Sequence, residues 1–111
     1  MEVLKKRNEF KLASSGKKFV TPSFIFLEHN LEDKMHSSPK IGYTASKKIG
    51  TSVQRNKAKR RMRSVISDVF LNYAKQDTNY VMIARKAILD YPYESLKSDL
   101  ESLCKKNLIM Q

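Results

Sequence analysis

The feature that most constrains the fold is an apolar repeat between residues 58 and 73. At about 100° per residue of an α-helix, one sector collects Ala58, Met62, Val65, Val69 and Tyr73, with Ile66 and Phe70 beside it. A helix with one apolar face must bury that face against another element, so the repeat predicts a central helix packed on a core. A chain of 111 residues with 41% hydrophobic content supports a modest core, and we expect residues 1–111 to form a single domain.

The opposite face of the same helix is polar and strongly basic. A second sector, about 100° wide and turned away from the first, contains Asn56, Lys59, Arg60 and Arg63. Spacings of three and four residues bring these side chains close together. Arg55 and Lys57 are expected in the first turn, where positive charge opposes the helix dipole. Because phosphate accepts hydrogen bonds from first-turn N–H groups and from arginine, this pattern favours a phosphate ligand.

The positive charge of the chain is concentrated in one window. Residues 34–67 contain ten Lys or Arg and no Asp or Glu, and so carry +10 of the net charge of +11. The segments on either side of this window are almost neutral. A solvated surface is the simpler explanation, but mixed signs serve solubility better than a block of one sign. We therefore favour a polyanionic partner, a nucleic acid in particular.

Three strands are predicted from β-branched and aromatic content, at Ser23–His29, Lys40–Ser46 and Thr78–Arg85. A weaker pattern indicates a fourth at Lys18–Thr21. Alternation along the first of these strands places Phe24 and Phe26 in the core. Residues 47–54, "KKIGTSVQ", are interpreted as a connecting loop.

Two further helices are predicted near the ends of the chain. The first covers residues 8–16, with Asn8 as its N-terminal cap, Phe10 facing inward and Gly16 ending it. The last covers residues 90–106, with Pro92 near its first turn. Its buried stripe is expected to consist of Leu96, Leu100 and Leu103.

No residue pattern indicates a protein active site or a metal site. A single cysteine, Cys104, excludes an internal disulfide and is interpreted as a packing residue in a cytoplasmic protein. His29 and His36 have no partner at metal-ligand spacing, and Asp68 is interpreted as a solubilising helix residue. No run of 18 apolar residues and no secretory signal is present, so we expect no membrane partner.

Residues 46–63, "SKKIGTSVQRNKAKRRMR", resemble the signature of the protein subunit of bacterial ribonuclease P. That signature has Ser-Lys-Lys and a following Gly, then Arg-Asn, two residues, Lys-Arg, two residues and Arg. The flanking "KIGYTAS" and "YVMIARKA" also match, and the resemblance covers almost the whole chain. A general RNA-binding module, such as a ribosomal protein, is the alternative, and the spaced motif argues against it.

The resemblance implies a fold and a function together. The fold is an α/β sandwich of order αβββαβα, with a mostly antiparallel sheet and a left-handed βαβ crossover. The function is removal of the 5′ leader from precursor tRNA by a ribonucleoprotein endoribonuclease. In this family the RNA subunit contains the catalytic site and holds the Mg²⁺. The implied partners of this chain, expected to be a monomer, are therefore the RNA subunit and the single-stranded leader.

The resemblance also implies two sets of site residues. RNA contacts are expected from Lys47, Lys48, Arg55, Asn56, Lys59, Arg60 and Arg63. A leader cleft between the first helix and the sheet is expected to use Phe10, Ile25 and Leu27. Ser14 and Leu27 stand where the family often has aromatic residues. Because stacking stabilises by roughly 1–3 kcal/mol per base, leader binding here is expected to depend more on charge.

Overall fold

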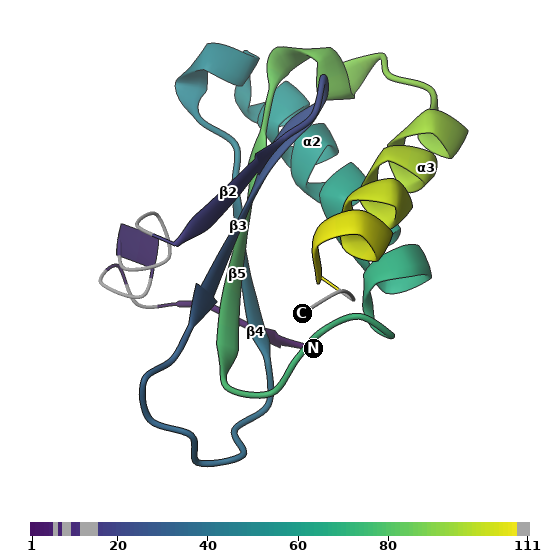
Figure 1. The fold of residues 1–111 in the computed structure, drawn as a ribbon. Coiled ribbons are helices and arrows are strands. Elements are labelled where there is room, and N and C mark those ends of the chain that lie inside the picture. Colours follow the sequence, from purple (N-terminus) through teal and green to yellow (C-terminus); the bar gives the residue numbers. More distant parts are fainter. Residues whose placement is uncertain (6, 8–9, 12–15, 109–111) are drawn as a thin grey trace.

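The computed structural model describes residues 1–5, 7, 10–11 and 16–108, which form one five-stranded sheet with helices (Figure 1). The strands are β1 (Glu2–Val3), β2 (Lys17–Val20), β3 (Phe24–Asn30), β4 (Lys40–Thr44) and β5 (Thr78–Ala84). Their order across the sheet is β1-β4-β5-β3-β2. Strand β3 is antiparallel to both its neighbours, whereas β4 is parallel to both β5 and β1. The sheet is therefore mixed.

Two α-helices of the described chain, α2 (Ser52–Val65) and α3 (Tyr93–Leu103), lie on the same side of this sheet (Figure 1). Each continues into a π-helical segment, α2 into η2 (Ile66–Phe70) and α3 into η4 (Cys104–Leu108). Short 3-10 segments, η1 (Lys47–Ile49) and η3 (Lys86–Leu89), precede the two helices. The order β4, α2, β5 makes a crossover between parallel neighbours, and its left-handedness stays a prediction.

The main core lies between the sheet and these two helices. Phe24 and Phe26 are fully buried there, as alternation along the strand predicted. The ring of Phe26 packs against Phe70 of η2 and Tyr80 of β5, with centroids 5.1 and 5.6 Å away. The predicted stripe of α3 is also buried. Burial of these large side chains is the main force that holds α2 and α3 on the sheet.

The α/β architecture predicted from the sequence is confirmed, with two local differences. Strand β1 was not anticipated, and the sheet has as many parallel as antiparallel pairings. Of the predicted first helix, Phe10 and Lys11 have helical backbone, as has Arg7 just before its predicted start. The predicted cap at residue 8 and the departure at residue 14 lie outside the described residues.

Candidate nucleic-acid interface

Helix α2 begins earlier than the sequence analysis predicted. Thr51 is its N-terminal cap: the Thr51 hydroxyl accepts from the Gln54 amide at 3.2 Å, and the Gln54 side chain accepts from the Thr51 amide at 2.8 Å. This capping box makes residues 52–54 helical rather than part of a loop. The first turn therefore ends at Arg55, and Lys57 lies beyond it, so the prediction that both residues sit in the first turn is wrong for Lys57.

The two faces of α2 are separated as the helical periodicity predicted. Ala58, Met62 and Val65 are fully buried against the sheet. The polar face is open to solvent: its exposed members are Asn56, Arg60 and Arg63, and its half-buried members are Arg55 and Lys59. Anchoring by the apolar stripe fixes the helix on the sheet and leaves the basic side chains outward.

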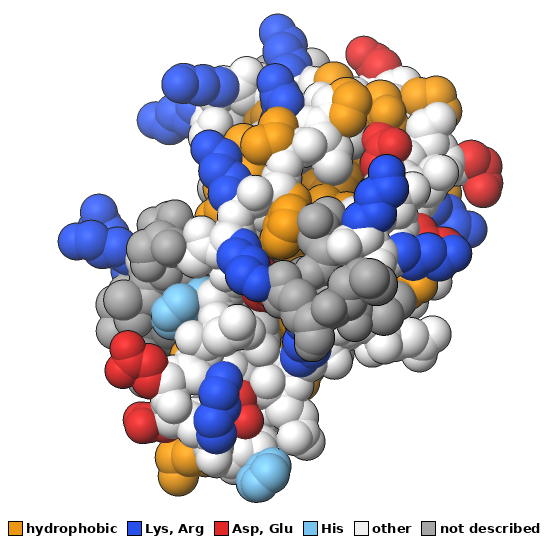
Figure 2. Space-filling view, in the orientation of Figure 1, with side chains coloured by type: hydrophobic (Ala, Val, Ile, Leu, Met, Phe, Trp, Pro, Cys, Tyr) orange, Lys and Arg blue, Asp and Glu red, His pale blue; other side chains and the backbone are white. Residues whose placement is uncertain are grey.

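Segment η1 adds two lysines beside the start of α2. Lys47 and Lys48 are exposed. Ile49, which lies between these two lysines and helix α2, is buried and anchors the segment to the core. Several Lys and Arg side chains stand out along the upper left of the molecule, where Figure 1 places η1 (Figure 2). We call the surface formed by η1 and the polar side of α2 the basic face; its members are Lys47, Lys48, Arg55, Asn56, Lys59, Arg60 and Arg63.

Arg61 lies among the basic residues of α2 in the sequence, but its side chain is not part of the basic face. It is half-buried and donates a hydrogen bond to the backbone carbonyl of Tyr91, just before α3. Its guanidinium carbon also lies 5.9 Å from the ring centroid of Tyr93. These contacts connect α2 to the start of α3, so this arginine supports the packing of two helices.

The other face of the sheet carries a second, smaller apolar cluster. It consists of Leu4, Phe10, Ile25, Leu27, Val81 and Ile83. The ring of Phe10 lies directly over Gly42 of β4, where a side chain on residue 42 would overlap it. The three predicted cleft residues are thus brought together, on the side of the sheet opposite α2.

Within this cluster the three predicted cleft residues differ in exposure. Phe10 and Ile25 are half-buried and keep part of their surface open. Leu27 is only 3% exposed and lies at the floor of the cluster, so it has almost no surface to offer a ligand. Ile83, which pairs with Ile25 across β3 and β5, is half-buried and was not identified from the sequence. We call the part of this cluster that stays open to solvent the apolar patch; its members are Phe10, Ile25 and Ile83.

Comparison with known proteins gives a consistent family assignment. The family model described as Ribonuclease P matches residues 1–107. The "Ribonuclease P protein component" of Paramagnetospirillum magneticum is 37% identical over 109 residues, which cover 96% of this chain and 82% of that protein. That of Bacillus pumilus is 32% identical, covering 97% and 89%. The chain belongs to the ribonuclease P protein family.

Solved structures of the family share the fold described above. The RNase P protein of Staphylococcus aureus superposes with a TM-score of 0.76 at 24% identity, covering 97% of both chains. That of Thermotoga maritima gives a TM-score of 0.75 at 22% identity, covering 96% of this chain and 97% of that one. The protein is thus a component of the ribonucleoprotein that processes the 5′ ends of precursor tRNA, and so part of an endoribonuclease holoenzyme.

Ribonuclease P catalysis depends on Mg²⁺, and family membership implies association with the RNase P RNA. Among the described residues of this chain, no group of three or more His, Cys, Asp or Glu is placed to hold a metal ion. Cys104 is buried, and burial raises the pKa of its thiol to about 12, so it remains a protonated packing residue.

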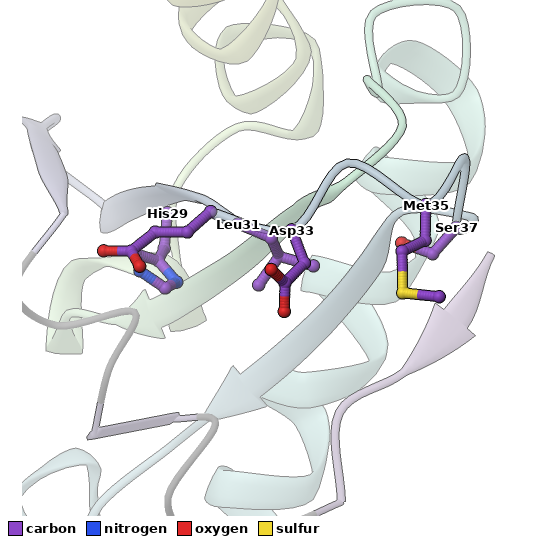
Figure 3. Close-up of a pocket in the computed structure, with 6 residues that line it drawn as sticks. His29, Leu31, Asp33, Met35 and Ser37 are labelled. Atoms are coloured by element: carbon purple, nitrogen blue, oxygen red, sulfur yellow. The ribbon is translucent and has the colours of Figure 1, made fainter.

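The loop between β3 and β4 forms a cavity of about 450 Å³ away from the basic face. Its lining residues, drawn as sticks in Figure 3, are His29 near the end of β3 and Leu31, Glu32, Asp33, Met35 and Ser37 of the loop. Asp77 fixes the loop, because its carboxylate accepts from the amides of Met35 and Ser37 at 3.2 and 2.9 Å. The two carboxylates in the lining disfavour a polyanion here.

None of the helices in the described ranges has the length and apolar character that crossing a bilayer requires.

Proposed function

We propose that the basic face binds the RNA subunit of ribonuclease P through its phosphates. The observation that carries this proposal is the exposure of Asn56, Arg60 and Arg63 on one side of a helix whose other side is fully buried. The described ion pairs, Lys75 with Glu28 and Lys105 with Glu101, lie on other elements. The charge of the basic face is therefore available to an external anion, and arginine forks suit phosphate geometry.

We further propose that the apolar patch contacts the single-stranded 5′ leader of precursor tRNA. Phe10 provides an aromatic ring with open surface, and Ile25 and Ile83 provide an apolar wall beside it. Because the apolar patch and the basic face lie on opposite sides of the sheet, one protein can contact both RNAs at once. Binding of the leader should raise the affinity of the holoenzyme for precursor tRNA.

The remaining parts of the proposal concern the assembly as a whole. The whole chain acts as one RNA-binding domain and one monomer, located in the cytoplasm, where its single buried thiol is stable. Mg²⁺ and the chemical step belong to the RNA subunit, and the protein raises activity when Mg²⁺ is scarce. A general RNA-binding module would have the same charge but no specific effect on leader cleavage.

Reconstitution tests the function directly. The protein is mixed with a ribonuclease P RNA at low Mg²⁺, and cleavage of precursor tRNA is measured with and without it. We expect the protein alone to cut nothing and the mixture to cut faster than the RNA alone. Cleavage by the purified protein without RNA would overturn this assignment of the chemistry, and an RNA rate unchanged by added protein would favour the general RNA-binding module.

Charge removal tests the basic face. The triple variant Lys59→Ala, Arg60→Ala, Arg63→Ala should bind the RNA subunit more weakly and with a flatter salt dependence. Each phosphate contact contributes about 0.7–0.9 to the log–log slope, so the slope should fall by about two to three units. The matched control removes the same charge elsewhere, through Lys86→Ala, Lys97→Ala and Lys106→Ala on η3, α3 and η4. Equal changes in both variants would show that net charge, rather than this face, binds the RNA.

A further inference from the structure

Arg63 is the one arginine of the basic face that lies over an aromatic ring. Its guanidinium carbon is 5.7 Å from the ring centroid of Tyr43, which is on β4. Tyr43 points to the same side of the strand as Ile41, toward the helices, and packs half-buried at the edge of the main core. A cation within about 6 Å of a ring centroid is attracted by the electron-rich face of the ring.

The ring of Tyr43 is neutral under physiological conditions. Burial raises the pKa of its phenol to about 12, although the charge of Arg63 acts in the opposite direction. A neutral ring attracts the guanidinium through its quadrupole without adding a negative charge that would compete with phosphate. The contact also uses none of the five N–H donors of the arginine, so these remain available for hydrogen bonds.

We propose that Tyr43 is a positioning residue that holds the guanidinium of Arg63 ready for a phosphate of the RNA subunit; this rests on the proposed function of the basic face. A free arginine side chain loses rotamer freedom when it binds, and that loss weakens the complex. Tyr43 reduces the loss, because its position is fixed by a sheet strand and by the core. The residue contributes to affinity although the sequence motif of the basic face does not include it.

The chain contains a matched control for this contact. Arg61 lies over Tyr93 at nearly the same distance, 5.9 Å, but faces α3 and is hydrogen-bonded to the Tyr91 carbonyl. Both pairs join an arginine of α2 to a tyrosine of another segment. Only the Tyr43 pair includes a member of the basic face. Removing the ring of Tyr93 therefore reports a general packing effect, and removing the ring of Tyr43 reports any effect on RNA binding.

The experiment measures equilibrium binding of the full-length protein to a ribonuclease P RNA. Tyr43→Leu should weaken binding about two- to fivefold, the equivalent of one exposed cation–π contact. The salt slope should not change, because no phosphate contact is lost. Tyr43→Phe keeps the ring and should bind like the natural protein. Tyr93→Leu should lower thermal stability and leave the affinity of the folded protein unchanged.

A double-mutant cycle then decides whether Tyr43 acts through Arg63. In an Arg63→Ala background, Tyr43→Leu should cause no further loss of affinity. The same loss in both backgrounds would overturn the inference while leaving the basic face intact. If Arg63→Ala itself had no effect on RNA binding, Arg63 would not contact the RNA, and the inference about Tyr43 would be overturned as well. Tyr43→Met, whose flexible unbranched side chain adapts better to the space that the ring leaves, replaces Tyr43→Leu in the cycle if the leucine variant does not fold.

Discussion

An alanine at position 42 is the sharpest test of the apolar patch. Gly42 faces the ring of Phe10, and a methyl group there would overlap the Cε1 and Cζ atoms and lie 3.2 Å from Cδ1. The ring is the end of a side chain, so it can swing away while strand β4 stays in place. Full burial of a Phe side chain stabilises by about 1.5–3 kcal/mol, so displacing this half-buried ring should cost about 1–1.5 kcal/mol of stability.

Gly42→Ala should weaken the binding of precursor tRNA more than the binding of mature tRNA. If Phe10 stacks on a leader base, its displacement removes about 1–3 kcal/mol, and the affinity of the holoenzyme for precursor tRNA falls about 5- to 150-fold. Mature tRNA has no leader and should bind as before. Affinity for the RNA subunit should also be unchanged, because α2 is on the other side of the sheet. Both affinities are measured by titration, together with a melting curve of each variant.

A second substitution provides the control. Phe10→Ala removes the ring that the new methyl group would meet, so Gly42→Ala should cost almost nothing further in that background. The reasoning is refuted if the folded Gly42→Ala protein keeps full affinity for precursor tRNA. It is also refuted if mature tRNA loses affinity to the same extent, since the effect would then not depend on the leader.

Three further outcomes follow from local contacts. Thr51→Ala removes the cap of α2 and should destabilise the protein by about 0.5–2 kcal/mol in urea unfolding. Arg61→Met should lower stability by about 1–2 kcal/mol through loss of the contacts to Tyr91 and Tyr93, with the salt slope of RNA binding unchanged. Hydrogen bonds from the Ser37 and Met35 region hold the pKa of Asp77 below its ordinary value. Its stabilisation is thus present above about pH 4 and lost as the pH falls through the lower folded value, so Asp77→Asn should flatten the acid limb of a stability–pH curve.

The elements that the sequence predicted correctly are those with a strong local period. The apolar repeat of α2 placed Ala58 and Met62 in the core, and alternation along β3 did the same for Phe24 and Phe26. In each case, neighbouring residues in the same helix or strand determine whether a side chain is buried. Such patterns are readable from the sequence because helix and strand periods differ.

The features that the sequence did not predict depend on distant partners or on a missed local signal. Strand β1 is two residues long and exists through its parallel pairing with β4, some forty positions away. Arg61 contacts residues about thirty positions later in the chain. Its position outside the polar sector of the helix could be read from the sequence. Glu28 is fully buried, and its carboxylate lies 3.9 Å from the Lys75 ammonium. Its burial follows from the same alternation along β3 that places Phe24 and Phe26 in the core. The early start of α2 comes from the Thr51–Gln54 capping box, which lies within the segment that the sequence predicts as a loop.

The division of the molecule into two faces explains the distribution of its charge. The basic window runs through β4, η1 and α2, and only the last two expose it as a continuous basic face. The apolar patch on the other side of the sheet consists of apolar side chains that contact one another, so it suits bases more than phosphates. The apolar patch favours leader binding through bases, whereas the sequence-based expectation gives charge a larger share; the salt dependence of precursor binding decides between the two. Added salt should weaken binding of the RNA subunit steeply and weaken the advantage of precursor over mature tRNA much less, which a salt titration of both affinities measures.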